Sequence, residues 1–207
     1  MSSDEGSVGS VSGSGALPPG QHWRDEPEIM HYGPVPRLRP DRWTFVVGGA
    51  TADGLEHTFE WADLAALPRQ ELVADMHCAT RWSAAGLRWA GPRALDVVAL
   101  APPAAEIARV LVFAEYGYAA NVPLADLRTA STLLATTLDG APLSVERGAP
   151  MRLVIPHLYT WKGPKWVRGW NYLTAEDTDL GFWEQRGYHR RGHAWQEQRY
   201  DYQGEHP

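Results

Sequence analysis

Short apolar runs, separated by glycine and proline, dominate the hydrophobic pattern of the chain. Runs rich in β-branched and aromatic residues predict strands at residues 43–47, 55–59, 71–77, 110–113, 133–137 and 152–155. Helical spacing predicts short helices at residues 61–67, 92–100 and 124–127. Because the strands outnumber the helices and do not alternate with long ones, the pattern favours an α+β fold of β-rich mixed sheets with short helices.

The two ends of the chain differ in character from its middle. Residues 1–20 are rich in serine and glycine and predict a flexible tail, which leaves residues 21–207 as a single domain. Prolines punctuate residues 21–40, so this stretch is expected to be extended and to wrap the domain. Residues 181–200 mix aromatic and charged side chains without a clear period, so the pattern predicts no element there.

Composition and charge narrow the choice of partner and location. Of 207 residues, 44% are hydrophobic and 21% charged, which is ordinary for a soluble globular protein. The net charge of −6 offers no basic field to attract nucleic acid. The N-terminus lacks a basic start followed by an apolar run, and no window holds about eighteen consecutive apolar residues. We therefore expect a cytoplasmic protein with no membrane span and no nucleic-acid partner.

The only cysteine, Cys78, is the first candidate for chemistry. A single cysteine excludes an intramolecular disulfide and any multi-cysteine metal site. It stands in the segment DMHCATRWS, residues 75–83, among hydroxyl groups, a histidine and an arginine. Such neighbours favour a thiolate, which suits nucleophilic attack or the binding of a soft or high-valent metal. The residues alone leave open an inert buried thiol, which is common for free cysteine.

A second segment, residues 148–169, concentrates cations around glycine and proline turns. It contains an apolar strand that begins at Arg152, and then a loop with Lys162, Lys165 and Arg168. A glycine-bearing loop of this kind can present backbone N–H groups and positive charges to a phosphate. The alternative is a solvated loop whose cations only face water. The ten tryptophans likewise predict either a rigid aromatic pocket or a tryptophan-rich core.

Taken together and in this order, the two segments resemble the molybdopterin-binding domain of the sulfite oxidase family, including its bacterial methionine-sulfoxide-reductase branch. The shared pattern is a cysteine followed by a short polar stretch and Trp-Ser, then an Arg-Leu-Val-x-Pro strand that leads to Lys-x-x-Lys. The resemblance covers roughly residues 30–175. The closing residues 181–184 and 187–188 are similar to those of small stand-alone members.

The resemblance implies a molybdenum–molybdopterin cofactor and assigns residues to it. Cys78 would be the protein's sulfur ligand to molybdenum, beside the two dithiolene sulfurs of the pterin. The positions that would bind the cofactor are His31, Tyr32, Cys78, Arg152, Gly163, Pro164 and Lys165. Glu115 and Arg147 fall near two further contact positions. Beside Cys78, Tyr118 and Arg81 are the candidate catalytic groups on the substrate side, with Tyr116 as another tyrosine that could face the substrate.

The resemblance also implies the reaction, a two-electron transfer of an oxygen atom to or from a small oxyanion, S-oxide or N-oxide. Animal and plant sulfite oxidases follow the cysteine with an arginine-rich run, whereas here Thr80-Arg81-Trp82-Ser83 follows, closer to the bacterial reductase branch. Sulfite is therefore not the expected substrate. The electrons are expected to pass to a separate carrier, such as a cytochrome, a flavoprotein or a small redox protein.

Two other hypotheses compete with this one. In the first, Cys78 is the nucleophile of a metal-free enzyme and needs a histidine such as His77 or His157 within hydrogen-bond reach. His77 adjoins Cys78, so on a strand the two side chains would point to opposite faces. In the second, the tryptophan-rich pocket binds a partner peptide and Cys78 is dispensable. No second metal site is predicted from His189 and His193, because nearby glycines weaken a helix there.

Overall fold

The computed structural model describes residues 15–39 and 42–203, so most of the predicted tail lies outside the described residues. The strands are β1 (His22–Arg24), β2 (Thr44–Gly49), β3 (His57–Glu60), β4 (Arg69–His77), β5 (Trp82–Pro92), β6 (Arg109–Ala114), β7 (Ala119–Pro123), β8 (Leu133–Ala135), β9 (Thr137–Leu138), β10 (Ala141–Pro142), β11 (Arg152–Val154) and β12 (Val167–Leu173). The helices are α1 (Trp61–Ala65), α2 (Ala94–Leu100) and α3 (Leu124–Leu127), and the 3-10 helices are η2 (Glu115–Gly117), η3 (Thr160–Lys162), η4 (Glu184–Arg186) and η5 (Ala194–Gln196).

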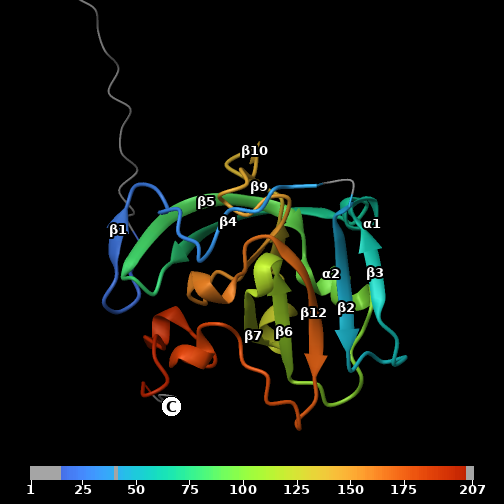
Figure 1. Ribbon diagram of the computed structural model, residues 1–207. Coiled ribbons are helices and arrows are strands. Elements are labelled where there is room, and N and C mark those ends of the chain that lie inside the picture. The colour runs from blue at the N-terminus through green and yellow to red at the C-terminus, as the bar shows by residue number, and fades with distance from the viewer. Residues whose placement is uncertain (1–14, 40–41, 204–207) are drawn as a thin grey trace, which may run out of the picture.

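One mixed sheet has the strand order β3-β2-β12-β6-β7 (Figure 1). Its central strand, β12, pairs parallel with β2 and antiparallel with β6. The sheet forms because its strands alternate between apolar and polar positions; in β6, for example, Val110, Val112 and Ala114 are buried and the residues between them are only half-buried. The buried faces pack against α1, α2 and α3, so this sheet carries the larger hydrophobic core.

The long strand β5 organises a second sheet. It pairs antiparallel with β4 along most of its length, and it curves over the first sheet in Figure 1. At the start of β5, residues 82–84 pair in parallel with β1, and further along Trp89 and Ala90 pair with β9. A separate core of Trp82, Leu87 and Trp89 lies under this sheet and includes Cys78. The turn that carries Cys78 is thus fixed between two paired strands.

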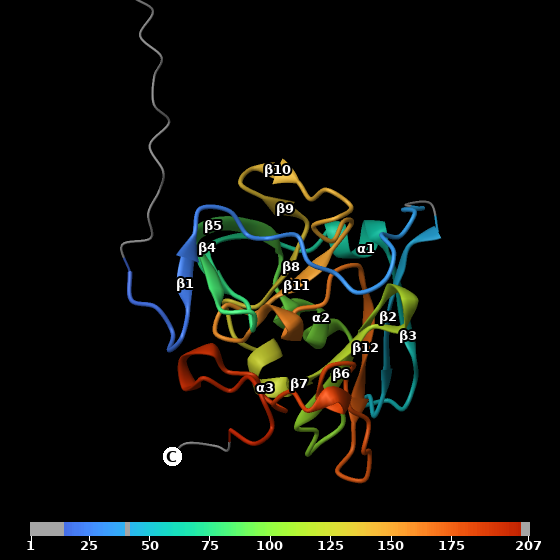
Figure 2. The ribbon, with the colours of Figure 1, turned by 60° about the vertical axis from the view of Figure 1, so that its left-hand side comes forward.

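A third, two-stranded sheet of β8 and β11 connects the two cores. Leu134 and Leu153 pair across it and belong to the larger core, whereas Leu133 and Val154 belong to the core that holds Cys78. The C-terminal segment, drawn in red, lies below the β4–β5 pair and beside β7 in Figures 1 and 2. No helix among the described residues is long and apolar enough to cross a membrane.

The α+β class with β-rich mixed sheets and short helices is confirmed, and the strongly patterned elements fall where they were predicted. The extended stretch after residue 20 also wraps the fold, since β1 adds to the edge of β5. The last residues of the predicted tail contact the domain. Pro18 is buried, and the Pro19 carbonyl accepts a hydrogen bond of 2.9 Å from Arg199.

Candidate functional site

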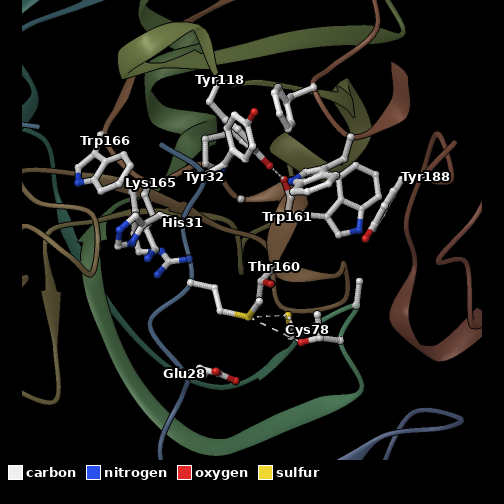
Figure 3. A pocket seen from close by; sticks show the side chains of 18 of the residues that line it. Glu28, His31, Tyr32, Cys78, Tyr118, Thr160, Trp161, Lys165, Trp166 and Tyr188 are labelled. Carbon is white, nitrogen blue, oxygen red and sulfur yellow. Dashed lines mark hydrogen bonds between the residues drawn. The ribbon is translucent and has the colours of Figure 1, made fainter. Parts of the chain in front are cut away.

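A cavity of about 430 Å³ lies where the N-terminal stretch, the turn after β4 and the loop after β11 meet (Figure 3). Much of its wall is aromatic or thioether, including Met30, Met76, Trp82, Trp161 and Trp183. Both interpretations of the tryptophans therefore apply, because others such as Trp89 and Trp170 are buried in the cores. Of the predicted residues, the cavity gathers His31, Tyr32, Cys78, Glu115, Tyr116, Tyr118, Arg152, Gly163, Pro164 and Lys165.

Cys78 lies in a tight turn between β4 and β5. Its N–H donates to Trp82 O at 2.9 Å, and its carbonyl accepts from Arg81 N at 3.1 Å and from the Gln21 side chain at 3.0 Å. Only 8% of Cys78 is exposed. The Thr80 hydroxyl donates to Sγ at 3.1 Å, and the Met30 sulfur lies 4.0 Å from Sγ. The turn thus aims a sulfur atom, supported by one hydroxyl donor, into the cavity.

The histidines that a metal-free cysteine enzyme would need are turned to other partners. His77 Nδ1 lies 2.8 Å from the Ser83 hydroxyl, and burial lowers its pKa. His157 Nε2 lies 2.9 Å from an Asp126 carboxylate oxygen. Neither histidine lines the cavity that contains Cys78. His31 does, but its ring packs edge-on against Trp166 at 5.7 Å between centroids.

Positive charge gathers on another part of the cavity wall, around Arg152 and Lys165. Arg152 is 7% exposed; one guanidinium nitrogen donates to Arg147 O at 3.2 Å, and its Nε has no partner among the described residues. Burial, followed by the charge of Arg147, lowers the pKa of Arg152 to about 10. Burial, followed by the charges of Arg152 and Arg147, lowers the pKa of Lys165 to about 7. A group of cations that disfavour one another's charge is suited to an anion.

The backbone beside these cations is shaped for close approach. A Cβ on Gly163 would collide with the Leu153 carbonyl, so only glycine fits there. Pro164 contributes its carbonyl, which accepts from Leu153 N at 3.0 Å and ties the loop to β11. Trp166, in the same loop, has a positive φ of 53°, an uncommon conformation for a residue other than glycine. Such backbone outliers gather at ligand sites.

Three of the proposed cationic groups do not face the cavity as cations. Lys162 is fully buried and forms an ion pair of 2.7 Å with Glu184. Arg168 forms an ion pair of 3.0 Å with Glu115, and it is Glu115 that lines the cavity. Arg81 is exposed, has a positive φ of 76°, lies beside Gly20 and does not line the cavity. The anion-binding hypothesis therefore narrows to Arg152 and Lys165, with Arg147 beside them.

Four tyrosines line the cavity, and the two half-buried ones, Tyr118 and Tyr188, differ in what their hydroxyls do. The Tyr118 hydroxyl donates to Trp161 O at 2.6 Å (Figure 3), and burial raises its pKa far above the usual range. The Tyr188 hydroxyl has no hydrogen-bond partner among the described residues, and its pKa is raised by burial, then by Tyr200 and Cys78. Its ring is held between Trp161 and Trp183, at centroid distances of 5.5 and 5.0 Å. Tyr188 is thus the half-buried tyrosine of the wall whose phenol makes no hydrogen bond within the described residues, whereas Tyr32 and Tyr116 are exposed.

Sequence reasoning missed Tyr188 as a site residue. It belongs to the aperiodic segment 181–200, from which no element was predicted, and it enters the cavity through tertiary contacts. The available signal was the closing Gly187-Tyr188 motif. Tyr32 was predicted, and it lies at the cavity mouth, 66% exposed, with its ring 4.6 Å from that of Phe182.

The cavity joins one cysteine sulfur, the cations Arg152 and Lys165 and a glycine-shaped loop. The sequence shows the family to which a chain with this site belongs. Residues 32–183 match the family described as the oxidoreductase molybdopterin binding domain. The chain belongs to this family of oxidoreductases.

Individual relatives place the chain within the family. It is 39% identical over 188 residues to the oxidoreductase YuiH of Bacillus subtilis, with 90% of this chain and 93% of YuiH covered. It is 29% identical to human mitochondrial sulfite oxidase, over 75% of this chain but only 33% of that protein. It is 27% identical to YedZ1 of Azospira oryzae, named a putative protein-methionine-sulfoxide reductase subunit, over 69% of this chain and 52% of YedZ1.

A solved structure shows the same fold. The sulfane dehydrogenase SoxCD of Paracoccus pantotrophus superposes with a TM-score of 0.62 over 72% of this chain and 44% of that chain, at 19% identity. The resemblance to the sulfite oxidase family that the two motif segments suggested is thereby confirmed in sequence and in fold. The chain spans about a third of sulfite oxidase and less than half of the SoxCD chain.

Proposed function

We propose that this chain binds a molybdenum–molybdopterin cofactor and uses it for two-electron oxygen-atom transfer to or from a small oxyanion, S-oxide or N-oxide. The observation that carries the proposal is that Cys78 and the cations Arg152 and Lys165 line one cavity. A thiolate suits the metal, and unpaired cations suit a phosphate. The residues present therefore fit both ends of a metal-bearing, phosphorylated pterin.

Each cavity residue has a role in holding the cofactor. Cys78 supplies the sulfur ligand, and the Thr80 hydroxyl, 3.1 Å from Sγ, donates to that sulfur and tunes it as a ligand. Arg152 and Lys165 hold the phosphate, with Gly163 and Pro164 giving the loop its shape. His31 and Tyr32 close the cavity from the N-terminal stretch. When bound, the cofactor supplies the two-electron oxygen-atom chemistry.

The remaining wall acts on the substrate. Tyr188 is half-buried in the wall, and its hydroxyl has no partner within the described residues, so it can donate to a polar S=O or N–O oxygen and orient it. Tyr118 fixes Trp161 through its hydrogen bond of 2.6 Å and so shapes the aromatic wall. The aromatic groups exclude water from the site. Arg81 lies outside the cavity and is not assigned a catalytic role.

The electrons of such a reaction must enter or leave by a second protein. We propose a separate redox carrier, a cytochrome, a flavoprotein or a small redox protein, as the partner of a cytoplasmic enzyme. The exposed Tyr32 and Tyr116 at the cavity mouth, 66% and 63% exposed, leave the site open on the side that such a carrier would approach.

The deciding experiment is elemental analysis for molybdenum on protein purified from a strain competent in cofactor synthesis. We expect near-stoichiometric molybdenum in the wild type and a large loss in Cys78→Ser, because a hydroxyl is a poor substitute for a thiolate ligand. Ser83→Ala serves as a control and should keep its metal. Ser83 pairs with His77 at the base of the same turn, but it does not line the cavity. Wild-type protein without molybdenum would refute the proposal.

A further inference from the structure

We propose that Lys162 is a positioning residue that holds the Tyr188 loop, residues 184–190, against the wall of the cavity. The inference rests on the proposed function, because it concerns the tyrosine assigned there to the substrate. Lys162 itself does not line the cavity, although its neighbours Trp161 and Gly163 do. It acts through the loop and touches no reacting atom.

The ammonium group of Lys162 is bonded on three sides. It donates to Asn121 O in β7 at 2.6 Å, to Glu184 Oε1 at 2.7 Å, and to Arg190 O through a short contact. An ammonium has three N–H donors, so this set is complete. Two of the three acceptors stand on either side of Tyr188 in the sequence. One buried cation thus fastens both ends of the loop to the strand behind it.

The loop has its own internal support but depends on the fastening at its ends. Tyr188 N donates to Trp183 O at 3.1 Å, and His189 N donates to Arg199 O at 3.1 Å. Gly187 has a φ of 82°, which makes a sharp turn just before the tyrosine. The Lys162 side chain also packs against the next glycine turn, where a Cβ on Gly192 would lie 3.2 Å from its Cγ. Small displacements at either end would therefore move the phenol.

The surroundings of Lys162 are costly to arrange, which suits a specific task. Its side chain is fully buried, and burial lowers its pKa to about 8 against the opposing influence of Glu184. The ammonium also lies 4.4 Å from the ring centroid of Trp161, a cavity residue. A buried ion pair of this kind contributes little net stability compared with apolar packing, whereas it fixes geometry. Lys162 therefore contacts β7, both ends of the Tyr188 loop and Trp161, against which the Tyr188 ring packs.

A double-mutant cycle separates positioning from general stability. The variants are Lys162→Met, Tyr188→Phe and the double variant, each purified with cofactor from a competent strain. We would measure kcat for dimethyl sulfoxide reduction by reduced benzyl viologen, or for sulfite oxidation by ferricyanide, whichever the wild type catalyses. Lys162→Met should lower kcat roughly 10- to 100-fold, as for a displaced active-site group. In the Tyr188→Phe background the same change should lower kcat less than about threefold, because the group it positions is already gone.

A readout independent of activity accompanies the cycle. Amide hydrogen exchange at residues 187–189 should be faster in Lys162→Met, and in Glu184→Gln, which keeps the side-chain volume if the lysine variant folds poorly. Arg93→Met is the matched control, since it removes a bidentate ion pair with Asp96, 2.8 to 3.0 Å, at the start of α2 away from the cavity. It should change neither loop exchange nor kcat.

The outcomes are distinct. Unchanged exchange at residues 187–189 in both variants would overturn the inference, as would a loss of kcat that is as large with Tyr188→Phe as without it. Wild-type protein that lacks molybdenum would refute the proposed function, and the exchange comparison would still decide whether Lys162 holds the loop. Faster loop exchange together with non-additive kcat effects supports the inference.

Discussion

At the scale of single residues, Lys165 links the cavity to pH, because its lowered pKa lets its charge change near neutral pH. Lys165 Nζ donates to Glu146 O at 2.7 Å, and burial with the charges of Arg152 and Arg147 lowers its pKa to about 7. In the unfolded chain its pKa returns to the ordinary value of a lysine, about 10.4. Between these values the unfolded state binds more protons, so this group makes stability rise with pH from about 7 to about 10.

Anion binding should show the opposite dependence on pH. We expect cofactor-free protein to bind sulfate more tightly at pH 6 than at pH 8.5, because Lys165 is charged only at the lower pH and a bound anion favours its charged form. Sulfate does not titrate in this range, so isothermal titration calorimetry reports the protein group alone. In Lys165→Met the affinity should be weaker and nearly independent of pH. An equally steep pH dependence in that variant would show that another group is responsible.

Lys165→Ala also tests the cofactor clamp. Loss of the charged partner should reduce pterin occupancy, measured as the fluorescent pterin oxidation product per protein, because charge-assisted hydrogen bonds to phosphate are among the stronger ones. Occupancy equal to the wild type would remove Lys165 from the clamp. Arg24→Ala is the control for loss of a cation outside the proposed phosphate site. It removes the exposed ion pair of 3.0 Å between Arg24 and Glu28.

At the scale of elements, the loop that follows β11 is shaped by Gly163. Its α-carbon approaches the Leu153 carbonyl so closely that a Cβ would collide with backbone, which cannot move aside as a flexible side chain does. Gly163→Ala should therefore destabilise the protein by about 1–3 kcal/mol, the usual cost of overpacking. Urea unfolding measures this change. Gly15→Ala, at an exposed glycine with open space around it, should stay within about 0.5 kcal/mol.

The elements with a clear period were predictable, and those held by distant partners were not. β6 alternates cleanly and was found, whereas β5, with Ala84, Gly86 and Gly91, has little intrinsic strand preference. β5 forms because β4 pairs with most of it and because Gly91 lets the Leu134 backbone approach. The first residues of β12 were predicted as the end of a cationic loop, yet β12 is the central strand of its sheet. Tertiary pairing decided these strands.

The same limit applies to the site. Cys78, Arg152 and Lys165 could be proposed together because their motifs are local in the sequence, and the structure brings them to one cavity. The ion pairs of Lys162 and Arg168 could not be predicted, because their carboxylate partners stand 22 and 53 residues away, at positions that no local pattern relates to them. Charge in a sequence shows that an ion needs a partner; only the fold shows whether the partner is a ligand or another side chain.

At the scale of the whole molecule, Arg199 joins the two ends of the described chain beside the cavity. It is 1% exposed, donates to Glu197 Oε1 at 2.5 Å and to Pro19 O at 2.9 Å, and lies over the Tyr159 ring at 5.2 Å. Two residues after Pro19, Gln21 donates to Cys78 O at 3.0 Å. The N-terminal stretch that covers the cavity is thus tied to both the C-terminal segment and the cysteine turn.

Arg199→Ala should release this tie. We expect a loss of about 2–3 kcal/mol in the free energy of unfolding, from lost hydrogen bonds of a charged group, measured in urea. Trypsin should also cut faster after Arg24, because β1 then loses an anchor at its N-terminal side and opens more often. Arg88→Ala, at an exposed position of β5, should change the free energy of unfolding by no more than about 0.5 kcal/mol. It should leave the rate of cleavage after Arg24 unchanged. If Arg199→Ala matched this control in both measurements, the pairing of β1 with β5 would hold the N-terminal stretch without help from the C-terminal segment.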